Sequence, residues 1–272
     1  MQHSAFVYTL FSYLQWIVAF YFLTAIGFFF LSDSVLFQPP YPSYQNAPPV
    51  FKIPLLKKEG KISAIYLINP QAKFTILYSH GNAEDLGTLL PLLKLYQQHG
   101  FSIFAYDYQG YGTSKGKASE ENTYEDIESA YYYLTKTLGI SGQNIIVYGR
   151  SVGSGPSTYL ATQVPIGALI LESPFVSAFR VKTVIPLLPF DKFPNLKRIS
   201  KITVPLLVIH GNNDNVIPPW HGKKIFAAAK EPKQAYWVKG GHHNNLLQVA
   251  QNQYWQTLDS FITKIEHKEP AA

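Results

Sequence analysis

A serine lies at the centre of a glycine-rich turn that could make it a nucleophile. Residues 145–148 form an apolar run that is rich in β-branched residues. Gly149, Ser151 and Gly153 follow it in the spacing G-x-S-x-G. This spacing is typical of a strand that turns into a helix within about three residues, which leaves the serine hydroxyl exposed at a strained tip. We expect side chains at either glycine to collide with the neighbouring helix and strand. The pattern is short, however, and also fits a glycine-rich turn with an incidental serine.

A reactive serine needs a base to take its proton, and the base needs an acid to orient it. Asp214 follows a predicted strand over 205–209, and His243 follows the last predicted strand, over 235–238. In this interpretation Asp214 fixes the imidazole tautomer and stabilises the imidazolium. His243 takes the proton of Ser151 and later returns it to the leaving group. Serine, acid and histidine then occur in an order known for serine hydrolases.

Neighbouring residues offer alternatives for both partners of the serine. His242 precedes His243, and a loop at a strand end directs only one of the two imidazoles inward. For the acid, Glu172 also follows a predicted strand and Asp191 lies in a later loop. We favour Asp214 because its strand directly precedes that of the histidine, although an Asx-turn role in its asparagine-rich loop is the alternative.

Two backbone N–H groups are candidates for an oxyanion hole. One is that of Val152, the residue after the serine. The other belongs to the loop after the predicted strand over 74–78, where we choose Asn82 first and Gly81 next. His80, in the same loop, fits a structural histidine that braces the turn better than a proton-transfer group.

The elements that must position these residues alternate along the chain. Strands are predicted over 61–68, 74–78, 101–108, 144–148, 168–171, 205–209 and 235–238, and helices over 86–98, 119–138, 153–161, 220–230 and 246–267. Alternation of this kind, with continuous apolar strands late in the chain, indicates an α/β domain around a mostly parallel sheet covered on both faces. Ligands bind at the carboxyl ends of such strands, where the polar loops lie.

Composition limits the chemistry further. The 272 residues suit one domain, and the absence of cysteine excludes disulfides, thiolate catalysis and thiolate metal sites. Spacing typical of a metal site, a P-loop or a dinucleotide fingerprint is lacking, so we expect no cofactor and no metal. The net charge is +6, with scattered basic residues and no nucleic-acid motif. These lysines and arginines indicate a solvated surface, with attraction to anionic lipid as the alternative.

The N-terminal segment is apolar enough for a membrane anchor. Residues 5–31 carry no charged side chain, and a helix of that length spans roughly 40 Å against a hydrocarbon core of about 30 Å. A cleaved signal peptide is the alternative, but no basic residue precedes the run and no small-x-small site stands out. We therefore assign 1–34 to a single-pass anchor in the cell membrane. The flanking charges are too few to set the face that carries the domain.

A proline-rich linker over 35–50 follows, with Pro39, Pro40, Pro42, Pro48 and Pro49. Proline favours extended backbone, so we expect a stiff spacer between anchor and domain. The catalytic domain is assigned to 51–267, and 268–272 form a tail.

Five motifs together resemble one branch of a known superfamily. They are SHGNAEDLG over 79–87, YDYQGYG over 106–112, YGRSVG over 148–153, ESPF over 172–175 and HGNND over 210–214. This set is similar to the membrane-associated α/β hydrolases that include the eukaryotic protein depalmitoylases and bacterial relatives. The resemblance covers roughly 35–265 and implies the α/β-hydrolase fold and serine hydrolase activity on acyl esters or thioesters. The family has glycine where this chain has His242, which places His243 and Asn244 at the catalytic position.

A short cap over 175–202 would cover the serine in such a fold. Phe175, Val184, Leu187 and Leu188 are candidates for an acyl-chain pocket, and the alternative is that they merely cover the sheet.

The combined prediction is a membrane-anchored serine hydrolase that cleaves acyl ester or thioester bonds through an acyl-enzyme. Its partners would be the lipid bilayer and an acylated protein, a lipid or a small ester, and not nucleic acid. Alternatives are a lipid or small-ester carboxylesterase, a peptidase, or a catalytically silent scaffold that binds a partner at the membrane.

Overall fold

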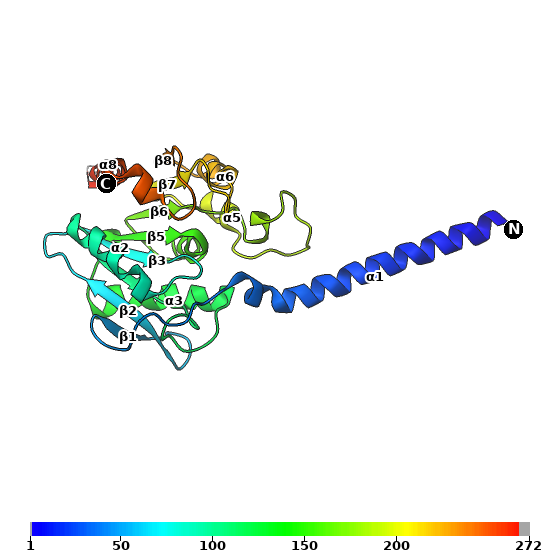
Figure 1. Cartoon of the computed structure of the whole chain (residues 1–272), viewed down its shortest axis with the longest axis horizontal. Coiled ribbons are helices and arrows are strands. Elements are labelled where there is room, and N and C mark those ends of the chain that lie inside the picture. The colour runs from blue at the N-terminus through cyan, green and yellow to red at the C-terminus, as the bar shows by residue number, and fades with distance from the viewer. Residues whose placement is uncertain (1, 267–272) are drawn as a thin grey trace.

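An eight-stranded sheet forms the centre of the domain in the computed structural model, which describes residues 2–266 (Figure 1). Its strand order is β1-β2-β4-β3-β5-β6-β7-β8. The pairs β1–β2 and β2–β4 are antiparallel, and every later pair in that order is parallel. The predicted mostly parallel α/β fold is therefore confirmed.

The elements follow one another in the expected alternation. The strands are β1 Val50–Pro54, β2 Lys61–Leu67, β3 Thr75–Ser79, β4 Ser102–Tyr106, β5 Ile145–Arg150, β6 Ala168–Glu172, β7 Leu206–Gly211 and β8 Lys233–Val238. The helices are α1 Gln2–Leu36, α2 Leu86–Gln98, α3 Glu120–Tyr132, α4 Ser154–Leu160, α5 Asn195–Ile199, α6 Trp220–Ala228, α7 Leu246–Ala250 and α8 Asn252–Glu266. A π-helical turn over Tyr133–Thr137 continues α3, and a 3₁₀ turn over Phe179–Val181 lies in the cap.

Helices cover both faces of the sheet, as the continuous apolar strands require. Apolar side chains of α2 and α8 pack with one face, and those of α3, α4 and α6 pack with the other. Every residue of β3 to β7 is buried as a result. The candidate site residues lie in the loops at the carboxyl ends of these strands, and the buried sheet gives those loops a rigid base.

Capping residues set the start of two of the predicted helices. Asp85 and Thr88 form a reciprocal capping box at the start of α2, which runs over the predicted residues. The Ser119 side chain accepts from the Asn122 N–H, 3.1 Å away, and so caps α3.

Three local features differ from the predictions. Strand β1 was not predicted, and it forms the sheet edge, where a proline such as Pro54 is tolerated. The predicted helix over 246–267 is wrong as one element, because Gln251 adopts a left-handed backbone with φ of 47° and separates α7 from α8. The helix predicted over 119–138 changes to π geometry after Tyr132. The predicted tail over 268–272 lies outside the described residues.

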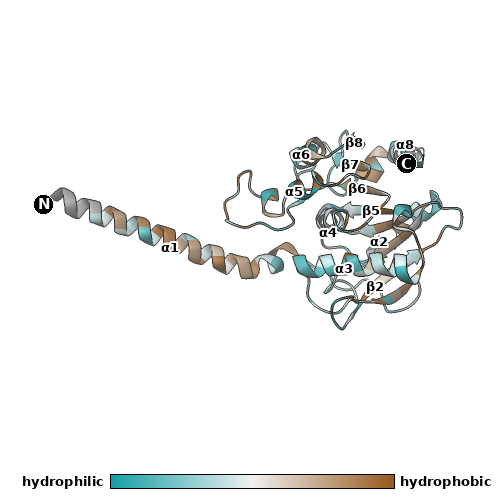
Figure 2. Cartoon of the chain, turned by 180° about the vertical axis from the view of Figure 1, so that it is seen from behind, coloured by the Kyte–Doolittle hydropathy of each residue, from teal (hydrophilic) through white to brown (hydrophobic). Residues whose placement is uncertain are grey.

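Helix α1 extends away from the domain as a long apolar rod (Figures 1 and 2). Its segment Tyr8–Leu36 is long enough to cross a membrane. The most apolar 18-residue window in this segment has a mean hydropathy of 2.0, and 6% of that window is buried. The cap reaches towards it: the Tyr21 hydroxyl donates to the Leu187 carbonyl over 2.9 Å, and the Phe28 ring lies 5.3 Å from that of Phe179. Residues 2–266 thus include one helix of membrane-spanning length and composition, near the N-terminus.

The proline-rich linker after α1 lies on the domain. The Ser43 N–H donates to an Asp85 carboxylate oxygen over 2.6 Å, and the Tyr44 hydroxyl donates to Asp107 over 2.5 Å. Asp85 and Asp107 belong to the loops after β3 and β4. The linker is therefore hydrogen-bonded to the domain at the carboxyl ends of the strands, where the candidate site lies.

Candidate active site

Ser151 lies at the tip of a sharp turn between β5 and α4. Its φ of 53° places it in the left-handed region, which is strained for serine, and a 3₁₀ turn over Ser151–Gly153 leads into the helix. A Cβ at Gly149 would lie 2.6 Å from the Ser157 hydroxyl, and one at Gly153 would overlap the Ser79 carbonyl oxygen. The collisions expected from the sequence are therefore confirmed, and they explain why both positions need glycine.

The structure brings Ser151, His243 and Asp214 into one hydrogen-bonded line. The His243 Nε2 atom lies 3.0 Å from the Ser151 hydroxyl, and its Nδ1 atom lies 2.8 Å from an Asp214 carboxylate oxygen. All three side chains are buried: Ser151 is 7% exposed, His243 is 8% exposed and Asp214 is 4% exposed. An ionised carboxylate only accepts, so Nδ1 carries the proton and Nε2 keeps a lone pair for the serine hydroxyl. This arrangement can make the serine a nucleophile.

The Asp214 carboxylate is held in place by its own loop. Oδ1 accepts from the N–H groups of Val216 and Ile217, over 2.9 and 2.8 Å. Burial alone would raise the pKa of Asp214, but hydrogen bonds from His210 and His243 hold it well below its ordinary value. His210 also donates to the Ile217 carbonyl over 2.8 Å, so it braces the loop that presents the acid.

The residues that the sequence left as alternatives for the base and the acid make contacts away from the serine. His242 is exposed, and its N–H donates to the Asn245 side chain over 2.7 Å. The Glu172 carboxylate accepts from the hydroxyls of Tyr148 and Tyr254, 2.6 Å from each. Asp191 lies in the cap, where it accepts from Ser177 over 2.6 Å and from the Phe179 N–H over 2.8 Å. The assignment of His243 and Asp214 stays a prediction that this geometry supports.

The loop after β3 offers one free choice for the second oxyanion donor. The Gly81 N–H donates to the Glu84 carboxylate over 2.8 Å, so our second choice, Gly81, is unsuitable. Asn82 is thus the remaining candidate, together with Val152 from the other side of the serine. Ala83 then adopts a left-handed φ of 56°, which turns the chain sharply after Asn82.

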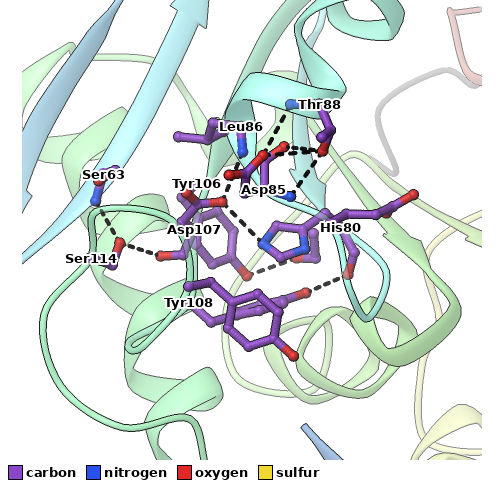
Figure 3. Close-up of polar contacts among 12 residues, drawn as sticks. Ser63, His80, Asp85, Leu86, Thr88, Tyr106, Asp107, Tyr108 and Ser114 are labelled. Atoms are coloured by element: carbon purple, nitrogen blue, oxygen red, sulfur yellow. Dashed lines mark hydrogen bonds and ion pairs between the residues drawn. The ribbon is translucent and has the colours of Figure 1, made fainter. Parts of the chain in front are cut away.

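His80 braces this loop through contacts with Gly81 and Asp107, and Figure 3 shows the ring beside Asp107. Its Nδ1 atom donates to the Gly81 carbonyl over 2.7 Å, and its Nε2 atom lies 3.3 Å from Asp107, with both side chains buried. Burial alone would lower the pKa of His80, but the hydrogen bond and charge of Asp107 and the Gly81 carbonyl raise it above its ordinary value. The Tyr108 hydroxyl donates to the His80 carbonyl over 2.8 Å. These contacts fit the structural role expected for this histidine.

Arg150 joins the loops of the site, and it is not among the residues predicted from the sequence. The guanidinium is bonded to the Glu84 carboxylate, and its Nε atom lies 3.1 Å from Glu172. Its Nη2 atom donates to the Asn244 side chain over 2.7 Å and lies 3.5 Å from the His243 carbonyl. The only signal in the sequence is that Arg150 precedes the serine.

The four residues proposed for an acyl pocket are not brought together. Leu187 and Leu188 line a cavity of about 260 Å³ within the cap, with Phe179 and Phe190 among its other walls. Phe175 is instead buried in the core, and Val184 is 75% exposed. The four side chains therefore do not line one cavity here, because Val184 is exposed and Phe175 lies in the core, and the acyl pocket stays a prediction.

Comparison with known proteins identifies relatives along most of the chain. A family described as serine aminopeptidase, S33, matches residues 70–190. Human alpha/beta hydrolase domain-containing protein 17B is 41% identical over 215 residues, which cover 76% of this chain and 73% of that protein. Alpha/beta hydrolase domain-containing protein 17C of Xenopus tropicalis is 41% identical over 202 residues, or 72% of this chain and 63% of that protein.

Solved structures of similar shape come from more distant proteins. A structure of the Pyrococcus furiosus esterase Pf2001 superimposes with a TM-score of 0.71 at 17% identity, covering 85% of this chain and 98% of the esterase. A serine hydrolase homologue from Coxiella burnetii gives a TM-score of 0.61 at 17% identity, covering 79% and 98%. At such identities the likeness shows the fold.

Proposed function

The chain belongs to the alpha/beta hydrolase domain-containing protein 17 family of α/β serine hydrolases, and on that premise we propose that it cleaves acyl ester or thioester bonds at a membrane through an acyl-enzyme. The observation that carries the proposal is the unbroken line from Asp214 through His243 to Ser151, with contacts of 2.8 and 3.0 Å. Convergence of three residues from separate strand ends on one hydroxyl is what nucleophilic catalysis by serine requires.

In the first half-reaction the Ser151 hydroxyl attacks the carbonyl carbon of the substrate. His243 Nε2 accepts the hydroxyl proton as the bond between Oγ and carbon forms, and Asp214 stabilises the resulting imidazolium. Collapse of the tetrahedral intermediate breaks the bond to the leaving oxygen or sulfur, which takes the proton from the His243 imidazolium and departs as the alcohol or thiol. The product of this step is an ester between the acyl group and Ser151.

In the second half-reaction water replaces the alcohol or thiol. His243 takes a proton from that water, the hydroxide adds to the acyl carbon, and the imidazolium then returns the proton to Ser151 as the acid departs. Both tetrahedral intermediates carry a negative oxygen. The N–H groups of Val152 and Asn82 would stabilise it, since removing one such donor typically costs about a hundredfold to a thousandfold in kcat.

The membrane location is the second part of the proposal. It is supported by the segment Tyr8–Leu36, whose most apolar window has a mean hydropathy of 2.0 and is too exposed to belong to a core helix. A cleaved signal sequence near the N-terminus would have the same composition. Carbonate extraction of membranes, with the mass of the mature chain, separates the two: the anchor predicts full-length protein in the membrane fraction, and a signal predicts a shortened chain.

A fluorophosphonate probe tests the catalytic part. Such probes react covalently with an activated serine, so the detergent-extracted protein should be labelled and Ser151→Ala should not. Unlabelled but folded wild-type protein would overturn the proposal in favour of a binding scaffold at the membrane. Hydrolysis of p-nitrophenyl esters and acyl thioesters of increasing chain length then separates thioesterase, carboxylesterase and, with an aminopeptidase substrate, peptidase activity.

A further inference from the structure

The Asn82 side chain is bonded to both sides of the end of helix α1. Its Nδ2 atom donates to the carbonyl of Leu36, the last residue of the helix, over 2.8 Å. Its Oδ1 atom accepts from the Gln38 N–H over 2.9 Å and from the Tyr111 hydroxyl over 2.5 Å. The last carbonyls of a helix have no partner within it, so Asn82 supplies one of the missing contacts.

The helix end that Asn82 binds is itself fixed to the domain. Phe37, between the two bonded residues, is buried, and its ring lies 6.1 Å from that of Phe193 in the core. One turn earlier, the Asp33 carboxylate lies 2.8 Å from the Lys192 ammonium and accepts from the Glu120 N–H over 3.2 Å. The end of α1 therefore offers Asn82 a rigid pair of partners.

The peptide on the other side of Asn82 is fixed as well. The preceding N–H, that of Gly81, is bonded to Glu84, and the following residue, Ala83, has a left-handed backbone. With both amide atoms of its side chain bonded, Asn82 has little freedom to rotate about Cα–Cβ. The direction of its backbone N–H is thus linked to the position of Leu36 and Gln38.

We propose that the Asn82 side chain is a positioning group that makes the oxyanion donor at residue 82 depend on the docked end of helix α1. The inference rests on the proposed function, in which the Asn82 N–H stabilises the oxyanion. A displacement of about 1 Å in a catalytic group can cost on the order of a hundredfold in rate. Loss of these contacts should therefore lower kcat much more than it changes KM.

Gln38 provides a test that leaves the site residues unchanged. Gln38→Pro removes the N–H that donates to both Asn82 Oδ1 and the Tyr111 hydroxyl, whereas Gln38→Ala keeps that N–H and removes only an exposed side chain. In full-length protein in detergent micelles, with a p-nitrophenyl ester as substrate, we expect Gln38→Pro to lower kcat about tenfold with KM within about twofold. The rate of fluorophosphonate labelling should fall in parallel, and Gln38→Ala should match the wild type in each measurement.

A second variant keeps the inference testable if Gln38→Pro does not fold. Asn82→Ala retains the backbone N–H but loses the side-chain contacts with Leu36, Gln38 and Tyr111 and the local one from the Ala83 N–H, so it should lower kcat by about tenfold to a hundredfold. If both changes act through one set of contacts, Asn82→Ala combined with Gln38→Pro should lower kcat no further than Asn82→Ala alone.

The outcomes separate this inference from the proposed function. Unreactive wild-type protein would refute the proposed function itself. If the wild-type protein is reactive, the positioning role alone can be refuted by the variants. It would be refuted if Asn82→Ala or Gln38→Pro lowered the melting temperature and left kcat and the labelling rate unchanged. Equal losses from Gln38→Ala and Gln38→Pro would refute it too.

Discussion

The Arg150 Nη2 atom lies 2.7 Å from the Asn244 Oδ1 atom, so the residue before the serine is hydrogen-bonded to the residue after the histidine. The same guanidinium is bonded to Glu84, whose carboxylate holds the Gly81 N–H, and to Glu172 at the end of β6. One largely buried cation thereby connects the nucleophile turn, the oxyanion loop, the histidine loop and a neighbouring strand. We infer that it sets the distances between these loops.

Replacement of Arg150 should reduce both stability and activity. Arg150→Ala leaves Glu84 and Glu172 without their cation, and breaking a buried pair in this way costs about 3–5 kcal/mol. Arg150→Lys keeps the charge but cannot reproduce the fork of hydrogen bonds, so it should fold and lose about tenfold in kcat/KM. Urea denaturation and ester hydrolysis measure the two effects. An unchanged unfolding midpoint for Arg150→Ala would contradict this role.

The assignment of the base can be tested with the adjacent histidines. We expect Ser151→Ala and His243→Ala each to lower kcat by at least about a thousandfold. His242→Ala should stay within about twofold, because that side chain is exposed and has no contact with the serine. Steady-state hydrolysis of one ester by the three variants is the measurement. A large loss in His242→Ala with an active His243→Ala would reverse the assignment.

The assignment of the acid can be tested with a matched pair of amides. Asp214→Asn keeps the shape of the side chain but favours the wrong imidazole tautomer, and we expect kcat to fall by about a thousandfold or more. Glu172→Gln makes the same chemical change in a residue that contacts tyrosines and Arg150 instead. It should retain kcat within about tenfold. The reverse order of losses would favour Glu172 as the acid.

Asp126 should make the fold more stable at weakly acidic pH. Burial raises its pKa to about 7, although it accepts from the Gln109 N–H over 2.9 Å and from the Gln109 side chain over 2.8 Å. The unfolded chain has an aspartate pKa of about 3.9, so between about pH 4 and 7 the folded state binds more protons. Its contribution to stability is therefore full below about pH 4 and is lost as the pH rises to about 7.

The contribution of Asp126 is isolated by comparing variants at two pH values. The difference in unfolding free energy between pH 5 and pH 8 should shrink in Asp126→Asn by an amount on the order of 1 kcal/mol or more. Asp259→Asn, at an exposed position of α8, is the control and should leave the difference unchanged. Denaturant titrations at both values measure it, and equal pH dependence in all three proteins would contradict the prediction.

Much of the fold was predictable because its signals are local. The glycines around Ser151 and the cap at Asp85 each specify a turn or a helix start within a few residues. Order along the chain then predicted which strand ends meet, since carboxyl ends of parallel strands share one edge. The approximate positions of Ser151, Asp214 and His243 follow from these rules.

The remaining features depend on contacts between distant segments. Arg150 binds partners from two other loops and the end of β6, and Asn82 binds a helix end more than forty residues away. No periodicity or spacing encodes either arrangement. The left-handed turn at Gln251 also lacks the glycine that would have marked it. In the cap, hydrophobic residues were correctly located in sequence, but hydrophobicity alone did not distinguish the buried Phe175 from the exposed Val184.

The bonded junction between α1 and the domain has a consequence for the choice of substrate. Because Leu36, Phe37 and Gln38 are held by Asn82 and the core, the domain cannot swivel freely about the end of its helix. With α1 seated across a bilayer as proposed, Ser151 would keep a constant height above the lipid surface. Acyl carbonyls would then be selected by their depth, and long molecules would react only where a scissile bond reaches that level.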